Sequence, residues 1–268
     1  MNEYEPFLTH SVKDAIMQHM LDDSPNEACG LITFTSGEYK YVRQTNISDT
    51  PTEHFQFSKD VSALLVSHDS VVAFVHSHPH GDAMPTKMDM QIQKDVGKPS
   101  VICSLDQTSG IVEVFSFGNH LLDYPLIGRE FRYGVFDCLE AIRSWRWQKE
   151  GALMDQFPRA YAWWFQDYAK DLDAEDLDLY MRHHESQGYR KFDVDLSDPA
   201  SQFHPMVGDL VFMRMGGDMN VCNHAAIYVG NNLIYHHRQN HKSTETPIGY
   251  CLGNGMIIGW ARQQDKLQ

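Results

Sequence analysis

The chain has 268 residues, 42% of them hydrophobic, which is enough for ordinary cores in one large or two modest domains. Its 22 Lys and Arg against 36 Asp and Glu give a formal net charge of −14, and no basic run appears. We therefore expect no binding to nucleic-acid phosphates and none to an anionic membrane surface.

The amino-terminal residues and the cysteines indicate folding in a reducing cytosol. The first 20 residues are acidic where a signal peptide is basic, and no apolar h-region or membrane-spanning segment follows. The five cysteines are odd in number and lack CxxC spacing: Cys29, Cys103, Cys138, Cys222 and Cys251. We expect no signal peptide, no disulfide framework, no thiolate zinc site and no membrane insertion.

The first elements are a helix and a hairpin. Apolar residues recur at helical spacing over Ser11–Leu21, and Ser11 is a suitable N-cap. Two short apolar runs, Leu31–Phe34 and Tyr39–Val42, enclose Ser36-Gly37, which predicts a hairpin with its turn at that pair.

A strand, a helix and a second strand follow. Phe55 and Phe57 alternate as in a short strand. Ser58 is the expected N-cap of a helix that runs to His68, with Val61, Leu64 and Leu65 on its buried face. The continuous apolar run Val71–Val75 is typical of a strand buried on both faces.

Two histidines extend that strand and point to a metal. His76 and His78 are two residues apart, so in extended backbone both imidazoles project to one side. Asp89 can join them if the loop after Pro79 folds back into a new helix. Two imidazoles and one carboxylate are a familiar zinc set, and catalytic zinc keeps a position for water.

Each of these residues also has a simpler reading. His-x-His occurs by chance, and Thr86 with Asp89 forms a capping-box pattern for a helix that continues to Val96. Glu27, just before a predicted strand, can stand beside the metal as a general base. Taken alone, Glu27 is a surface turn carboxylate.

The remainder of the first domain is two strands. Val101–Leu105 and Ile111–Phe117 are both rich in apolar and β-branched residues, and the domain closes near residue 120. Residues 121–130 contain Pro125 and Gly128 without clear periodicity, so we expect the linker there.

A second candidate site begins at Cys138, the first residue of an amphipathic helical pattern. The free amide groups and the dipole of a helix N-terminus favour the thiolate, which is the nucleophilic form of cysteine. The alternative is a buried, inert cysteine, which is the usual finding for a lone Cys.

Two later histidines are candidate partners of Cys138. After a predicted strand at Leu210–Met213, residues 223–236 form two strands around Asn231-Asn232, so His224 and His236 come close if these strands pair. One imidazole then takes the thiol proton and the second orients it. Because the chain has 15 histidines, surface or packing roles remain open for each. The aromatic and acidic segment 151–204 is expected to wall one side of the Cys138 cleft.

The first candidate site resembles the JAMM motif of the MPN-domain metallopeptidases. The resemblance lies in Glu27 with Ala-Cys-Gly-Leu-Ile, in His76-Ser-His78-Pro79, and in Asp89 thirteen residues after His76. It implies zinc held by the two histidines and Asp89, with Glu27 moving the proton. Thr86 stands where the family has a serine that helps to hold the oxyanion.

The second candidate site resembles the NlpC/P60 cysteine peptidases. The motifs are Gly-Val-Phe-Asp-Cys, Pro-x-x-Gly-Asp-Leu-Val-Phe, Asn-His-Ala-Ala-Ile-Tyr-Val-Gly and Leu-Ile-Tyr-His. The resemblance implies that Cys138, His224 and His236 are the catalytic Cys, His and third polar residue. Leu139-Glu140 departs from the family's usual Ser-Gly, which bears on substrate fit.

The order of these motifs is similar to that in the tail-tip assembly proteins of long-tailed bacteriophages, the lambda tail protein K type. The fold class is expected to be α+β, with a JAMM/MPN-like α/β sandwich at 1–120, a linker at 121–130, and a papain-like NlpC/P60 domain with an antiparallel sheet at 131–268. The resemblance implies a protein made in the host cytoplasm and associated with the virion tail tip.

The implied function is a two-site peptidase. Cys138 would cut peptidoglycan stem peptides next to diaminopimelate, and the Zn2+ site would cut a tail protein or a second peptide bond. Peptidoglycan peptides and tail-tip proteins are then the partners. Two alternatives stay open, namely an assembly or structural factor whose catalysis is dispensable, and a JAMM isopeptidase acting on a ubiquitin-like tag, which leaves Cys138 unexplained.

Overall fold

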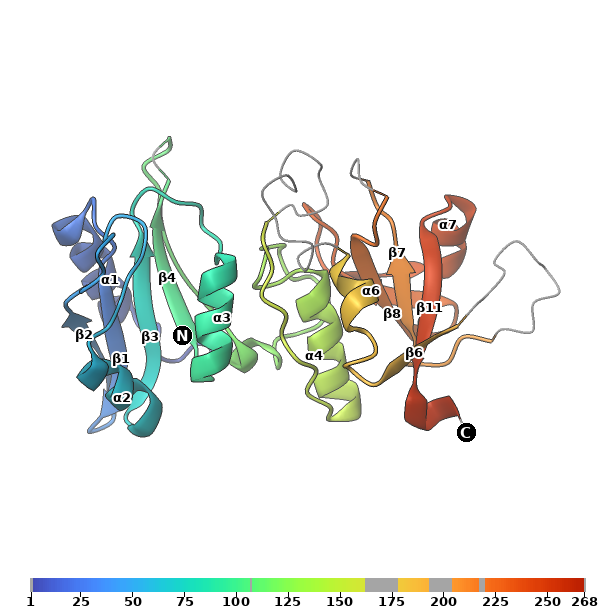
Figure 1. Ribbon diagram of the computed structural model, residues 1–268, viewed down its shortest axis with the longest axis horizontal. Coiled ribbons are helices and arrows are strands. Elements are labelled where there is room, and N and C mark those ends of the chain that lie inside the picture. Colours follow the sequence, from blue (N-terminus) through green and yellow to red (C-terminus); the bar gives the residue numbers. More distant parts are fainter. Residues whose placement is uncertain (1, 107, 162–177, 193–203, 217–219, 268) are drawn as a thin grey trace. The chain divides into compact units, whose positions relative to one another are not determined.

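The computed structural model describes residues 2–106, 108–161, 178–192, 204–216 and 220–267. The chain divides into two compact units, Met1–Leu121 and Leu122–Gln268 (Figure 1). Each unit holds one sheet with helices packed against it, so the expected α+β class is confirmed. No helix among the described residues is long and apolar enough to cross a membrane.

The first unit is built on a five-stranded sheet in the order β2-β1-β3-β4-β5. Only β3 and β4 are parallel, and α3 makes the crossover between them. The other pairs are antiparallel. The strands are β1 Cys29–Thr35, β2 Glu38–Gln44, β3 Val71–His78, β4 Ser100–Leu105 and β5 Val112–Phe117.

Helices cover both faces of this sheet, which is why β3 begins with the continuous apolar run Val71–Val75. The helices are α1 His10–Asp23, α2 Lys59–Ser67 and α3 Lys87–Val96, with a short 3-10 turn at Asn119–Leu121. From α1, Ile16 and Met20 pack on Ala73 and Val75. On the opposite face, Leu65 of α2 packs with Phe74.

Three local predictions in this unit were wrong. The N-cap of α1 is Thr9, whose side chain accepts a hydrogen bond from the Val12 amide, so Ser11 already lies inside the helix. Phe55 and Phe57 belong to no strand, because Asn46 hydrogen-bonds the backbone there in place of a partner strand. Leu64 is 47% exposed, whereas Leu65 is buried in the core and Val61 packs against the same cluster, as predicted for these two residues.

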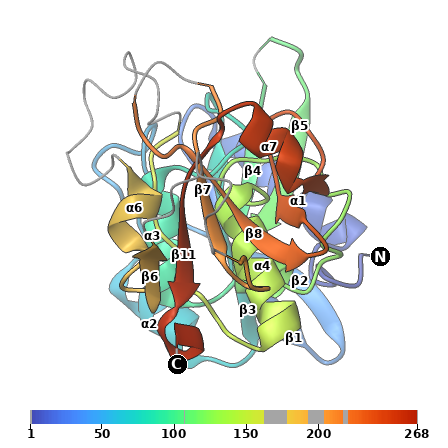
Figure 2. The same ribbon diagram turned by 90° about the vertical axis from the view of Figure 1, so that its right-hand side faces the viewer.

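The second unit has a six-stranded, fully antiparallel sheet in the order β10-β9-β8-β7-β11-β6, as expected. Figures 1 and 2 label its strands β6, β7, β8 and β11. Its strands are β6 Tyr189–Phe192, β7 Leu210–Met213, β8 His224–Gly230, β9 Leu233–His236, β10 Thr244–Pro247 and β11 Ile257–Gln263. Asn231 and Asn232 both adopt positive φ, which makes the tight turn between β8 and β9.

Among the described residues of this unit, one long helix and several short ones pack on the sheet. They are α4 Cys138–Glu150, α6 Leu179–His183, α7 Ile248–Gly253 and the 3-10 turn Gln264–Leu267. From α4, Leu139 and Ile142 enter a core with Ile227 and Tyr235. Packing of α4 on the inner strands brings its first residue to the end of the sheet where the histidines of β8 and β9 lie.

Candidate active sites

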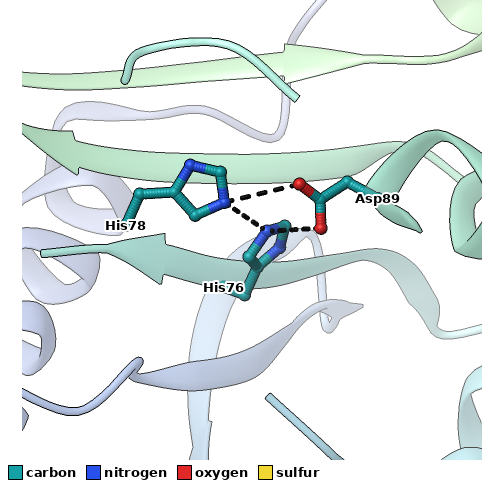
Figure 3. Close-up of side chains that lie close together, drawn as sticks. All are labelled: His76, His78 and Asp89. Carbon is teal, nitrogen blue, oxygen red and sulfur yellow. Dashed lines mark hydrogen bonds and ion pairs between the residues drawn. The ribbon is translucent and has the colours of Figure 1, made fainter. Parts of the chain in front are cut away.

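The strand β3 and the helix α3 bring His76, His78 and Asp89 together (Figure 3). Nε2 of His76 lies 3.1 Å from Nε2 of His78 and 3.1 Å from Oδ1 of Asp89. Nε2 of His78 lies 3.4 Å from Oδ2 of Asp89. All three side chains are buried, and one ligand atom from each lies within 4.8 Å of the others.

This donor set fits zinc. Tetrahedral zinc with bonds of about 2.1 Å holds its ligand atoms roughly 3.4 Å apart, close to the observed separations. Nδ1 of His78 lies 3.2 Å from the carbonyl oxygen of Asp82. When Nδ1 carries the proton and donates it to that oxygen, the lone pair of Nε2 points to the space between His76, His78 and Asp89. The Phe55 ring stacks on His76 at 4.5 Å.

Thr86 fixes the carboxylate of Asp89 through a capping box. Its hydroxyl and its backbone N–H both donate to Oδ2 of Asp89, at 2.7 and 2.8 Å, and the Asp89 amide donates to the Thr86 oxygen. Thr86 is therefore the N-cap of α3, as the sequence indicated. The hydroxyl and the backbone N–H of Thr86 thus hold the carboxylate of Asp89, a candidate metal ligand, in place.

Electrostatics favour an ionised Asp89. Burial opposes ionisation, yet the adjacent His76 and His78 hold the pKa of Asp89 well below its usual range. Burial also opposes protonation of His78, but its hydrogen bond and ion pair with Asp89 raise the pKa of His78.

Glu27 lies beside this centre, one residue before the buried pair Ala28-Cys29. The Ala28 amide donates to the Ser77 hydroxyl at 2.8 Å, and Cys29 pairs with His76 across β1 and β3. Burial raises the pKa of Glu27, although His76 and His78 oppose the shift. A buried carboxyl with a raised pKa suits a group that accepts a proton and returns it.

In the second unit, Cys138 begins α4. Asp137 is the N-cap, and its carboxylate accepts the amides of Leu139 and Glu140. The other Asp137 oxygen is bound by the Arg159 guanidinium and by the Gly134 amide. This buried ion pair holds the turn that presents the thiol, and no local sequence pattern indicated Arg159.

The two predicted histidines lie in a hydrogen-bonded row. Nε2 of His224 is 3.0 Å from Nδ1 of His236, and Nε2 of His236 is 2.9 Å from the Thr246 hydroxyl. His224 thus keeps Nδ1 for a proton from another group. His237 is not part of this row, because its Nε2 lies 3.0 Å from the carbonyl oxygen of His241.

Cys138 and His224 line one cavity of about 510 Å3. Tyr180 of α6 also lines it, and its hydroxyl lies 2.7 Å from Sγ of Cys138. Arg159 and Tyr180 come from the segment expected to wall this cleft, while residues 162–177 and 193–203 of that segment lie outside the described residues. Nothing in the sequence pattern singled out Tyr180.

The prediction that the helix N-terminus favours a thiolate was wrong. Burial, followed by the charge of Asp137, raises the pKa of Cys138 to about 11, and the Tyr180 hydrogen bond only partly offsets this. Burial, with His236 and Arg238, lowers the pKa of His224 well below its usual value. Burial and Arg238 also lower the pKa of His236 to about 4. A neutral thiol therefore faces neutral imidazoles at pH 7.

Comparisons with known proteins agree with two domains in this order. The family model for prokaryotic homologs of the JAB domain matches residues 9–115, and the NlpC/P60 family model matches residues 128–251. Tail tip assembly protein K of Escherichia phage N15 is 31% identical over 236 residues, covering 88% of each chain. The protein of that name from Escherichia phage lambda is 29% identical over 168 residues, covering 62% of this chain and 69% of its own.

One solved structure is similar at low identity. An NlpC/P60 family protein from Bacillus cereus ATCC 10987 is 14% identical, with a TM-score of 0.32, and the match covers 91% of this chain and 66% of that one.

Proposed function

Because this chain belongs to the phage tail tip assembly protein K family, with a JAB domain before an NlpC/P60 domain, we propose that it is a two-site peptidase of the tail tip. The observation that supports the proposal is the location of Cys138 in the cavity lined by His224, the first residue of the hydrogen-bonded histidine row. The thiol and His224 share one cavity, and His236 is hydrogen-bonded behind His224. Nucleophile, base and orienting group are the three parts that covalent peptidase chemistry requires.

In the proposed reaction, Sγ of Cys138 attacks the carbonyl carbon of a peptide bond as His224 takes the thiol proton. His224 then gives that proton to the leaving amine, and the acyl group stays on sulfur as a thioester. Water hydrolyses the thioester and restores the thiol. The raised pKa of Cys138 and the lowered pKa of His224 support proton transfer during attack, in place of a standing ion pair. Tyr180 is placed to donate a hydrogen bond to the sulfur.

The first unit is proposed to be a zinc site. His76, His78 and Asp89 would hold the ion, and their separations of 3.1 to 3.4 Å support that assignment. Zinc bound there would supply a Lewis acid that makes water a nucleophile at neutral pH. Glu27 would take and return the proton, and Thr86 would hold the ligating carboxylate.

Family membership also suggests where and on what the protein acts. We assign the Cys138 site to peptidoglycan stem peptides beside diaminopimelate, and the zinc site to a tail protein or a second peptide bond. Synthesis in the host cytoplasm followed by association with tail-tip proteins would bring the cysteine site to the cell wall.

The test is digestion of purified peptidoglycan, with mass spectrometry of the released fragments. We expect wild type and His78→Ala to release stem-peptide fragments and Cys138→Ala to release none. Cys251→Ala is the matched control, because Cys251 is a free buried thiol of α7 that does not line the cavity. If neither wild type nor any variant releases fragments from peptidoglycan, the proposed hydrolase activity is contradicted. Normal tail assembly by both mutants would favour an assembly factor with dispensable catalysis.

A further inference from the structure

The Cys138 cavity is basic, although the chain has a net charge of −14. Its described lining holds three arginines against one carboxylate, Asp137. Asp137 is already bound by Arg159. Two arginines of the lining, Arg214 and Arg238, are therefore left in excess. A cavity that concentrates positive charge within an acidic protein attracts anionic ligands.

Neither of these two arginines forms an ion pair or a side-chain hydrogen bond within the part of the chain that the structure describes. Nε of Arg238 is buried and has no hydrogen-bond partner there. Other arginines of the same unit are paired, as Arg146 with Glu150 and Arg262 with Asp209 show. A buried guanidinium nitrogen without an acceptor is unfavourable, and a bound anion would relieve that cost.

Both arginines flank the histidine row. Arg214 directly follows Met213, which pairs with His224 across β7 and β8. Arg238 lies two residues beyond His236, and its charge contributes, after burial, to lowering the pKa of His236. A ligand held by these two side chains would thus lie beside the base and within the same cavity as the thiol.

We propose that Arg214 and Arg238 bind a carboxylate of the substrate next to the scissile bond, so that this site selects acidic peptides. The guanidinium group is the side chain best suited to this task, because it offers paired N–H donors to both carboxylate oxygens. The inference rests on the proposed cysteine peptidase function and specifies which stem peptides it accepts. Peptides whose carboxylates are amidated at that place are poor ligands.

Binding to the Cys138→Ala variant tests this without cleavage. Two synthetic L-Ala-γ-D-Glu-diaminopimelate peptides are compared by calorimetry. In one, the carboxylates next to the proposed scissile bond between γ-D-Glu and diaminopimelate are free, and in the other they are amidated. We expect the free form to bind roughly 10- to 100-fold more tightly, as for hydrogen bonds to charged groups. In this background, R214Q and R238Q should each remove most of that preference and leave the affinity for the amide unchanged.

R190Q is the matched control, because Arg190 is exposed on β6 and does not line the cavity, and it should keep the full preference. R238K should keep part of it, since the charge remains without the planar fork. Equal affinity for both peptides, or equal losses in R190Q and R238Q, would overturn the inference. If the free peptide binds as expected but the wild-type protein cuts neither, the proposed peptidase function fails and the carboxylate site stands.

Discussion

Nε2 of His224 lies 3.0 Å from Nδ1 of His236, and the far nitrogen of His236 reaches the Thr246 hydroxyl at 2.9 Å. This row sets which nitrogen of His224 is left to take the thiol proton. A positioned base contributes about 10²- to 10⁴-fold to rate, so His224→Ala should lower kcat by that order.

Thr246→Val should have a smaller effect, because it removes one hydrogen bond from the orienting residue and leaves His224 in place. A net loss of about 0.5–1.5 kcal/mol corresponds to a roughly two- to tenfold fall in kcat. Thr246→Ser keeps the hydroxyl and should restore the wild-type rate. Steady-state kinetics on a stem peptide separates these outcomes, and a serine variant as slow as the valine variant would contradict the hydrogen-bonded row.

Thr86 should stabilise helix α3 and strengthen zinc binding. Thr86→Val removes the hydroxyl that caps α3 and binds Oδ2 of Asp89. We expect a loss of about 1 kcal/mol in unfolding free energy and roughly 10- to 100-fold weaker zinc binding. Thr86→Ser should retain both properties. The measurements are denaturant unfolding and competition with a zinc chelator, and unchanged zinc affinity in Thr86→Val would contradict the orienting role.

Tyr180 should facilitate ionisation of the nucleophile. Burial and Asp137 raise the pKa of Cys138 to about 11, and the Tyr180 hydroxyl acts in the opposite direction. In Tyr180→Phe the pKa of Cys138 should therefore rise further, so alkylation by iodoacetamide at pH 9 slows. Peptide mass spectrometry distinguishes Cys138 from the four buried thiols. Faster alkylation in the Phe variant would show that Tyr180 stabilises the thiol instead.

Acid should destabilise the first unit through His120. Burial lowers the pKa of His120 from 6.5 to about 4. Between these pH values the unfolded state therefore binds a proton that the folded state does not bind. The contribution of neutral His120 to the free energy of unfolding is full above pH 6.5. It decreases as the pH falls from 6.5 to 4 and is lost below that, a change of at most about 3 kcal/mol. Hydrogen exchange of β4 amides measures this loss. His120→Gln should have a shallower pH dependence, and exposed His10→Gln should match wild type.

The sequence predicted structural features that depend on residues close together in the chain. The apolar run of β3 with its two histidines, the Thr86 capping pattern and the β8–β9 turn at Asn231-Asn232 all follow from local spacing. Phe55 and Phe57 alternate in the same way without forming a strand, because the Asn46 side chain hydrogen-bonds the backbone of this segment.

The sequence did not predict side-chain contacts between elements that are far apart in the chain. Tyr180 is 42 residues from Cys138, and Arg159 is 22 residues from Asp137, with no periodic pattern joining either pair. The ionisation of Cys138 also differs from the expectation, because burial and Asp137 raise its pKa although Tyr180 and Arg159 act in the opposite direction. The first cause of the raised pKa is burial of the thiol, which depends on tertiary packing that the local sequence does not show.

The central claim is that Cys138 attacks a peptide bond of the stem peptide. The most direct measurement is the intact mass of the protein, quenched in acid during turnover of a synthetic stem peptide. We predict an acyl adduct on Cys138 that is absent from Cys138→Ala, which should also fail to cut the peptide. Cleavage by Cys138→Ala at the wild-type rate would contradict it.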